Sequence, residues 1–372
     1  MARSDRSGLR VALRQDQPIG LSVELTCACG ELLALVGPSG SGKTSILRAI
    51  TGTLRVRAGY VGVDGEVWFD SERGIFVPPH RRRVGIVFQS YALFPHMTAR
   101  ANVEMALGHL PRRERGERAR ELLARVHLQG LEERKPGQLS GGQRQRVAVA
   151  RALAREPAVL LLDEPFSAVD KATRERLYRE IATLRRDLGM PIVLVTHDLD
   201  EARMLADRMT ILHRGRTLQT GTPAEIVARP ATAEVARLVG LRNLFRSRVL
   251  RHEPERGRTI LAFAGRELET SYDPRFAAGE EVDWVIPDGS ILLHRRDRPS
   301  RGERENPLSG RIGELLDLGP NTLATLLLDG THGIRLHFSL PVHVARRNGL
   351  AVGVAASVSL LADGIHLLAK DG

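Results

Sequence analysis

The sequence predicts an α/β domain with an inserted helical subdomain, followed by a small all-β domain. Four short apolar runs each end at a polar residue or a glycine-rich loop, which is typical of buried parallel strands. No further strand pattern occurs between residues 89 and 157, where apolar residues follow a helical period instead. The 372 residues suffice for two domains. The four runs are Leu32 to Val36, Val84 to Phe88, Val159 to Leu162 and Ile192 to Thr196.

The ends of these runs predict where a ligand binds. In open α/β sheets, ligands bind beyond the carboxyl ends of the parallel strands. We therefore expect the polar residues that follow the runs to gather at one edge of the sheet. They are Gly37, Gln89, Asp163, Glu164 and His197.

The first run leads into a glycine-rich loop, residues 37 to 44, that reads Gly-Pro-Ser-Gly-Ser-Gly-Lys-Thr. It fits the phosphate-binding pattern G-x-x-x-x-G-K-[ST] and stands between a strand and a helix, as that pattern requires. Backbone N–H groups of such a loop face phosphate oxygens, and the helix N-terminus adds partial positive charge. We expect Lys43 to reach the β and γ phosphates and Thr44 to offer its hydroxyl to Mg²⁺. The loop thus predicts a P-loop NTPase.

Lys43 is one of only four lysines among 55 basic residues. Arginine is therefore the usual cation of this chain, and a lysine at this position indicates a specific requirement. A compact ammonium fits inside a tight loop where a planar guanidinium does not.

Two carboxylates follow the third apolar run. We expect Asp163 to hold Mg²⁺ through its water shell, since Mg²⁺ keeps most of its waters in proteins. Glu164 is the candidate base for the attacking water, and His197 is placed to orient that water against the γ-phosphate. Gln89 is expected to bridge to Mg²⁺ or to the water. Alone, each of these residues has a structural alternative: an acidic turn after a strand, or a histidine satisfied by its neighbours.

A second glycine-rich stretch opens a helix in the predicted helical subdomain, which spans about residues 90 to 156. It reads Leu139-Ser140-Gly141-Gly142-Gln143. One domain cannot wrap two such cradles around the same phosphate, so the second cradle needs another explanation.

Taken together, these motifs resemble the ATP-binding subunits of ABC transporters over roughly residues 9 to 239. The matching segments are Walker A (37 to 44), Gln89, the signature motif (139 to 143), Walker B (159 to 164), residues 167 to 170 and His197. The resemblance implies that two copies enclose two MgATP, each held by Walker A of one copy and the signature motif of the other. It implies these nucleotide-binding residues: Gly37, Pro38, Ser39, Gly40, Ser41, Gly42, Lys43, Thr44, Ser45, Ser140, Gly141, Gly142, Gln143 and Asp170.

Adenine recognition departs from the family pattern. The family usually stacks adenine on an aromatic residue before Walker A, whereas no aromatic residue precedes Tyr60 here. Aliphatic residues such as Val11 or Leu13 are then expected to contact the base.

The stretch after Gln89 is similar to the surface of ABC importers that receives a helix of the membrane permease. Residues 90 to 98 read Ser-Tyr-Ala-Leu-Phe-Pro-His-Met-Thr, an apolar and aromatic segment suited to docking. The implied partners are a second copy of the chain, permease subunits at Gln89 to Thr98 and, indirectly, a periplasmic or extracytoplasmic solute-binding protein. The implied location is peripheral, at the cytoplasmic face of the inner membrane.

Residues 68 to 75 and 78 to 89 are similar to the molybdate importer subgroup. The expected solute is therefore molybdate or a related oxyanion, with sulfate, ferric iron, a polyamine or a sugar as alternatives. The sequence does not name the solute, because the solute contacts the permease and the binding protein rather than this chain.

The chain changes character after about residue 240. Short strand-like runs separated by Asp-Gly turns predict an all-β domain at residues 241 to 372, similar to the OB-like (TOBE/Mop-type) regulatory domains of importers. Residues 295 to 306 are polar and predict a linker between its halves. Short helices near 225 to 227 and 233 to 239 are expected to close the ATP-binding domain, residues 1 to 240.

The net charge of +11 permits contact with nucleic acid or an anionic membrane. The arginines are spread along the chain rather than gathered, so we expect no nucleic-acid partner. A soluble ABC ATPase acting on nucleic acid is nevertheless the alternative of another class, and a regulator that only senses ATP is disfavoured by Glu164. No apolar run reaches the roughly 18 residues that a membrane-spanning helix needs.

Overall fold

A computed structural model describes residues 8–17, 19–167, 171–294, 305–331 and 333–369. The chain forms two compact units, Met1–Pro223 and Ala224–Gly372. The division falls before the expected boundary at residue 240, because α8 (Ala233–Leu238) packs on Val285 and Leu368 of the second unit. Within the described ranges, no helix is long and apolar enough to cross a membrane.

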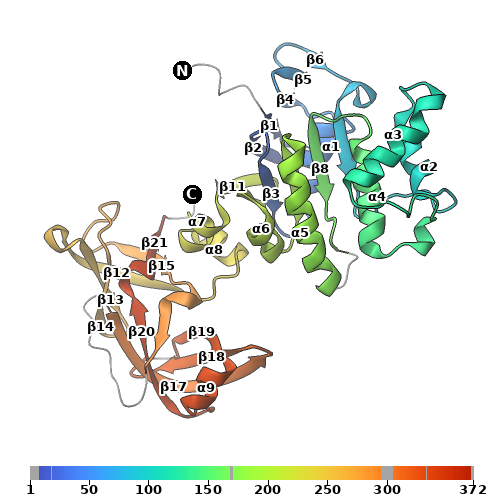
Figure 1. Cartoon of the computed structure of the whole chain (residues 1–372). Helices are drawn as coiled ribbons and strands as arrows, with labels where there is room; N and C mark the ends of the chain where they lie inside the picture. The colour runs from blue at the N-terminus through green and yellow to red at the C-terminus, as the bar shows by residue number, and fades with distance from the viewer. Residues whose placement is uncertain (1–7, 18, 168–170, 295–304, 332, 370–372) are drawn as a thin grey trace. The chain divides into compact units, whose positions relative to one another are not determined.

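The four apolar runs form neighbouring parallel strands, as predicted, at one end of the sheet of the first unit. Figure 1 labels two of them, β3 and β8. They pair in the order β3-β9-β8-β7. Every residue of β3 and β9 is buried, so these strands have no polar face. Their bounds are β3 Leu32–Val36, β7 Val84–Val87, β8 Val159–Asp163 and β9 Ile192–Thr196.

The sheet continues beyond β3 through strands that the apolar runs did not reveal. β10 lies parallel to β3, and β11 is antiparallel to β10. The far strands pair antiparallel in the order β6-β5-β4-β1-β2. Buried and exposed residues alternate along β2. The bounds are β1 Leu9–Gln15, β2 Leu21–Cys27, β4 Ala58–Val63, β5 Glu66–Asp70, β6 Ile75–Phe76, β10 Arg208–His213 and β11 Arg216–Gly221.

The segment between β7 and β8 is helical, as predicted. Its helices share one apolar core with β8, to which Leu122, Leu123 and Val147 contribute fully buried side chains. The helices of this subdomain are α2 Ala99–Glu104, α3 Arg112–Arg125 and α4 Gly141–Leu153; those elsewhere in the unit are α1 Lys43–Thr51, α5 Lys171–Leu188 and α6 Leu199–Leu205.

The second unit is all-β apart from short helices, in agreement with the predicted class. Two five-stranded sheets have the orders β14-β13-β12-β15-β21 and β16-β20-β17-β18-β19. Trp284 is fully buried in their common core, where its ring contacts those of Phe245 and Phe263. The strands are β12 Leu244–Glu253, β13 Arg258–Phe263, β14 Arg266–Ser271, β15 Glu281–Val285, β16 Ile291–Leu293, β17 Glu305–Leu318, β18 Asn321–Leu328, β19 Arg335–Pro341, β20 Ala355–Leu361 and β21 His366–Leu368, and the helices are α7 Pro223–Ala228, α8 and α9 Val342–Arg347.

The expected linker at residues 295 to 306 ends earlier than predicted. Residues 295–304 lie outside the described residues, but Glu305 and Asn306 already belong to β17. Asn306 is buried because its amide joins the two sheets: Oδ1 accepts from the Glu269 N–H at 2.7 Å, and Nδ2 donates to the Leu360 carbonyl at 2.9 Å. The linker prediction is therefore wrong at these two residues, whose polar side chains belong to a strand.

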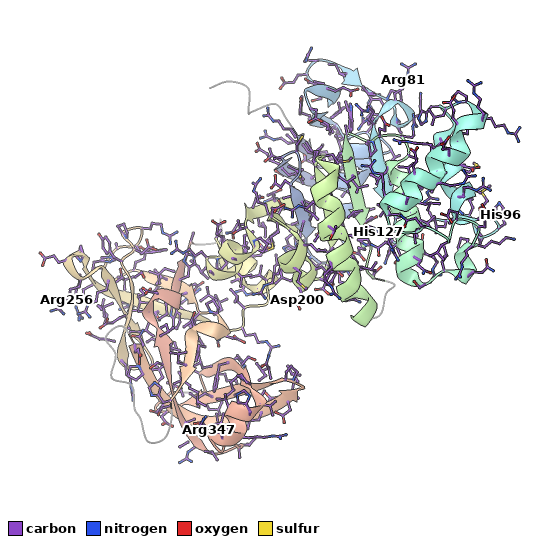
Figure 2. All side chains as sticks on the ribbon, viewed as in Figure 1. Arg81, His96, His127, Asp200, Arg256 and Arg347 are labelled. Carbon is purple, nitrogen blue, oxygen red and sulfur yellow. The ribbon has the colours of Figure 1, made fainter. Side chains whose placement is uncertain are left out.

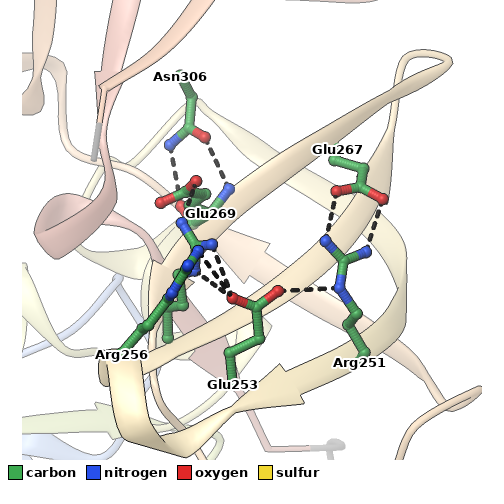
Figure 3. A network of polar contacts seen from close by, with 7 residues as sticks. Arg251, Glu253, Arg256, Glu267, Glu269 and Asn306 are labelled. Carbon is green, nitrogen blue, oxygen red and sulfur yellow. Dashed lines mark hydrogen bonds and ion pairs between the residues drawn. The ribbon is translucent and has the colours of Figure 1, made fainter. Parts of the chain in front are cut away.

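Next to Asn306, a network of ion pairs covers the face of β12, β13 and β14 (Figure 3). Arg251 binds Glu267 through two hydrogen bonds of 2.6 and 2.8 Å and also contacts Glu253. Arg258 joins Glu253 at 2.7 Å to Glu269 at 2.6 Å. These charges neutralise one another within the unit.

Arg82 has a structural role that the sequence does not predict. Its buried guanidinium donates to the Ala49 and Ile50 carbonyls at 2.8 and 2.7 Å, at the end of α1, and to Val77 at 2.8 Å. Burial lowers its pKa to about 10. The last turn of α1, the helix that follows the phosphate loop, is thereby tied to the segment before β7.

We expect Arg82→Met to destabilise the first unit by about 3 kcal/mol, because it leaves buried carbonyl oxygens without a donor. The chain has two tryptophans, Trp68 in the first unit and Trp284 in the second. In a Trp284→Phe background, Trp68 fluorescence therefore reports the urea unfolding of the first unit. Arg81→Met, which removes an exposed neighbour, should leave the midpoint unchanged. Equal midpoints for both variants would contradict the assigned role.

Candidate functional site

The phosphate loop, residues 37–44, joins the end of β3 to the first turn of α1. Gly42 precedes the helix with φ 99°, a left-handed conformation that favours glycine. A Cβ atom on Gly37 would come within 2.2 Å of the Leu212 carbonyl oxygen, so only glycine lets the loop leave the sheet here. The local sequence thus dictates a backbone that curls around the N-terminus of α1.

Lys43 points its ammonium back into this loop. Nζ donates to the Gly37 carbonyl at 2.6 Å and to the Pro38 carbonyl at 3.0 Å. Burial lowers the pKa of Lys43, while the charges of Glu164 and Asp163 act in the opposite direction. The Lys43 ammonium and the Asp163 and Glu164 carboxylates therefore act on one another electrostatically at this edge of the sheet.

The carboxylates lie where β8 ends. Asp163 is the last residue of the strand, and its pKa is raised first by burial and then by the charge of Glu164, with Lys43 opposing. Glu164 has φ 44°, an unusual value for a residue other than glycine, and its N–H donates to the Val195 carbonyl at 3.0 Å. The Glu164 carboxylate lies near the end of β9, where it meets His197.

His197 follows β9 and meets Glu164 there. Its Nδ1 lies 3.2 Å from Glu164 Oε1, and its ring is more than half exposed. Glu164 and His197 line a small cavity of about 110 Å³ together with Ser167, Arg174, Thr196, Asp198 and Glu201. The geometry brings together the predicted base and the predicted water-orienting group, although their roles stay predictions.

The sequence did not identify Glu201 as a site residue, although it lines the same cavity as His197. Glu201 is 4% exposed and accepts a hydrogen bond from the Thr196 hydroxyl. Burial raises its pKa. Asp198 caps α6 by accepting from the Asp200 and Glu201 N–H groups. A Thr-His-Asp-x-x-Glu spacing at a helix start is the signal that predicts such a cap.

Gln89 follows β7 with an exposed side chain. In the described part of the chain, its amide forms no hydrogen bond with Asp163, Glu164 or His197. The structure therefore places Gln89 at the end of the correct strand but does not join it to the other predicted site residues. Of the segment that follows, Phe94 is 40% exposed, whereas Tyr91 is 5% exposed.

The signature motif opens α4 with a reciprocal cap. Ser140 Oγ accepts from the Gln143 N–H at 3.2 Å, and Gln143 Oε1 accepts from the Ser140 N–H at 2.9 Å. Ser140 is exposed, while Gly142 is buried. Among the described residues, no hydrogen bond or ion pair joins residues 139–143 to the phosphate loop.

The remaining predicted nucleotide ligands are placed as follows. Ser39, Gly40 and Thr44 are exposed on the loop, and Ser45 is half-buried in α1. Asp170 lies outside the described residues. The predicted adenine contacts are wrong. Buried residues alternate with more exposed ones along β1, and Val11 and Leu13 are on its buried face, where they are 2% and 0% exposed.

The donor set fits a nucleotide with Mg²⁺. The loop supplies N–H groups at a helix N-terminus and one ammonium for phosphate oxygens. The Thr44 hydroxyl and the Asp163 carboxylate are oxygen ligands of the kind that Mg²⁺ takes. A nearby cation would also relieve the repulsion between the Asp163 and Glu164 carboxylates.

Figure 2 shows Arg81, Arg256 and Arg347 on three separate elements of the two units. All three are exposed. The absence of a nucleic-acid partner stays a prediction.

Several known proteins are similar to this chain. The family model described as ABC transporter matches residues 21–167. The spermidine/putrescine import ATP-binding protein PotA of Oleidesulfovibrio alaskensis is 40% identical over 317 residues, which are 83% of this chain and 80% of the relative. The sulfate/thiosulfate import ATP-binding protein CysA 2 of Chromobacterium violaceum is 39% identical, covering 89% and 86%. The Fe(3+) ions import ATP-binding protein FbpC 2 of Rhizobium meliloti is 37% identical, covering 94% and 87%.

A solved structure is similar to part of the chain. It is cbiO1 from Clostridium perfringens, described as part of the ABC transporter complex cbiONQ. The TM-score is 0.54 at 29% identity, and the match covers 60% of this chain and 92% of that chain.

We expect Asp163→Asn to make the first unit more stable at pH 7. The folded state raises the pKa of Asp163, so at neutral pH the ionised carboxylate opposes folding, and a neutral amide removes that penalty. The gain should shrink as pH falls through the raised pKa and should vanish below the ordinary value of 3.8, where the carboxyl is protonated in both states. Urea midpoints of Trp284→Phe chains at several pH values measure this. The exposed Asp16→Asn is the control; a gain independent of pH would contradict the assignment.

Proposed function

Because this chain belongs to the family of ABC importer ATP-binding subunits, in which ATP hydrolysis is coupled to transport, we propose that it works as a dimer that closes on two MgATP. The observation that carries the proposal is the separation of its two phosphate cradles. Each is shaped to present backbone N–H groups at a helix N-terminus, and no polar contact joins them in the described residues. Two chains related by a two-fold axis bring each loop to the other chain's signature motif.

Within each site we assign the following roles. Residues 37–45 hold the phosphates, with Lys43 on the β and γ groups. Thr44, Asp163 and Gln89 hold Mg²⁺, which when bound neutralises charge on those phosphates. Glu164 accepts the proton of the attacking water, and His197, 3.2 Å from it, orients that water.

The signature motif completes the site of the other chain. The exposed Ser140 hydroxyl and the N–H groups of Gly141 and Gly142 stand at the start of α4, a 13-residue helix whose dipole favours the γ-phosphate. Gln143 fixes Ser140 through the reciprocal cap. Asp170 is proposed to couple the two sites across the dimer.

The energy of closure is proposed to reach a membrane permease through Gln89 to Thr98. Phe94, 40% exposed and in edge contact with His96, provides an apolar contact suited to a permease helix. This arrangement places the chain peripherally at the inner face of the membrane, with a solute-binding protein acting indirectly. The second unit is proposed as the regulatory domain.

For the solute, we propose a polyamine. The predicted molybdate has no support among the relatives reported above, whereas PotA, at 40% identity over most of both chains, is named for spermidine and putrescine import. Sulfate and ferric iron, named for the other two relatives, are the competing assignments.

A mixture of two inactive variants tests the shared sites. Lys43→Ala and Ser140→Arg should each abolish ATP hydrolysis alone. Mixed dimers contain one intact site, formed by Lys43 of one chain and Ser140 of the other, so an equal mixture should recover roughly a quarter of the wild-type rate by random pairing. Mixing Lys43→Ala with Asp163→Asn is the matched control, because both changes affect the same half of a site and no intact site results. No recovery in the first mixture would refute the shared site.

The solute assignment is tested in proteoliposomes that hold the chain with its permease and solute-binding protein. Spermidine or putrescine should raise the ATPase rate several-fold, since productive closure follows solute delivery. Sulfate, Fe³⁺ and molybdate serve as the comparison solutes. Stimulation by molybdate alone would overturn the polyamine assignment and support the oxyanion prediction.

A further inference from the structure

The segment after Gln89 has an unusual backbone. Tyr91 and Ala92 have φ values of 60° and 46°, two consecutive non-glycine residues in the left-handed region. Such a conformation costs about 1 kcal/mol or more per residue and persists only where neighbours hold it. The neighbours that hold it come from elements that carry the nucleotide motifs.

Arg151 supplies the first restraint. Its Nη1 donates to the Ala92 carbonyl at 2.6 Å, and its Nη2 donates to the Tyr91 carbonyl at 2.7 Å. The planar guanidinium thus binds the carbonyl groups of both strained residues at the same time. Burial lowers the pKa of Arg151, but arginine remains charged at neutral pH and the bonds are charge-assisted.

Arg151 lies on α4, the helix that Ser140 caps. About three helical turns, roughly 16 Å at 1.5 Å per residue, separate the two residues. Because a helix transmits displacement along its axis, a movement of the signature motif moves the Arg151 end of the helix with it.

Tyr91 and Asn102 fix the rest of the segment. The Tyr91 ring is buried, and its hydroxyl donates to the Pro165 carbonyl at 3.2 Å, directly after Glu164. Fully buried Asn102 accepts from the Phe94 N–H at 2.8 Å and donates to the Thr98 carbonyl at 3.0 Å. The exposed Phe94 therefore stands on a segment held from both ends.

We propose that Arg151 is a positioning residue that couples the signature helix to residues 89–98, so that dimer closure on ATP displaces Gln89 and the exposed Phe94 together. The inference rests on the proposed dimer function. It adds the physical connection between the signature motif and residues 89–98. Lysine in place of arginine donates from a single nitrogen and cannot grip both carbonyls in the same geometry.

Arg146 provides a matched control on the same helix. Its Nη1 donates to the Val126 and His127 carbonyls at 3.3 and 2.9 Å, at the end of α3. Arg146→Met therefore removes an arginine of α4 that also binds two carbonyls, but these lie outside residues 89–98. Comparing it with Arg151→Met separates a general loss of stability from a loss of coupling.

The test uses the full chain carrying Arg151→Met, Arg151→Lys or Arg146→Met. ATP turnover gives kcat and KM. Hydrogen exchange of residues 88–98, with and without MgATP in a Glu164→Gln background, reports whether closure reaches this segment. We expect Arg151→Met to lower kcat about 10-fold with KM within twofold, and to abolish the ATP-dependent change in exchange. Arg151→Lys should restore part of both, and Arg146→Met should lower the unfolding midpoint while retaining both.

The inference is overturned if Arg151→Met keeps the ATP-dependent change and the wild-type kcat, or if Arg146→Met loses them equally. Should Arg151→Met fail to fold, the same comparison is made with Arg151→Lys, for which wild-type values in both measurements overturn the inference. Failure of Glu164→Gln itself to form an ATP-dependent dimer on size-exclusion chromatography would count against the proposed function instead. The split between kcat and KM in chains that retain Glu164 then still decides the role of Arg151.

Discussion

The site depends on the register of three buried parallel strands. Val36 of β3 pairs with Thr196 of β9, and Val195 pairs with Asp163 of β8, so the strands end level with one another. Since side chains within β3 and β9 are buried throughout, polar groups can appear only where these strands stop. The strand ends alone therefore bring four groups to one edge of the sheet: the phosphate loop, the two carboxylates and His197.

That edge carries several features that are unfavourable in isolation. Glu164 adopts a left-handed conformation, burial raises the pKa of Asp163, and burial lowers the pKa of Lys43. Each shift destabilises the charged group in isolation, and each is eased by a charge of opposite sign nearby. Backbone strain and shifted pKa values that occur together are typical of sites that bind charged ligands.

The sequence predicted the parts of the fold whose signal is local. Continuous apolar runs revealed β3, β7, β8 and β9, and the two glycine-rich stretches marked the starts of α1 and α4. Val11 was misread as a contact for adenine, since an aliphatic residue in an alternating strand gives no sign of which face it occupies until its partners are known. Asn306 was misread as part of a linker because its buried partners, Glu269 and Leu360, lie far away in sequence. The grip of Arg151 on Tyr91 and Ala92 depends likewise on how α4 packs, which no local pattern contains.

The basic composition gains a different explanation from the structure. Arg82, Arg151 and Arg146 each donate to two or more backbone carbonyls, at the ends of α1 and α3 and at the strained segment after β7. Carbonyls at helix ends and in irregular loops lack backbone donors, and a guanidinium can satisfy two of them while keeping its charge. In the second unit, Arg251 and Arg258 are neutralised by glutamates instead. Part of the net charge of +11 therefore reflects arginines used to hold the fold together, so the charge alone does not argue for a polyanionic partner.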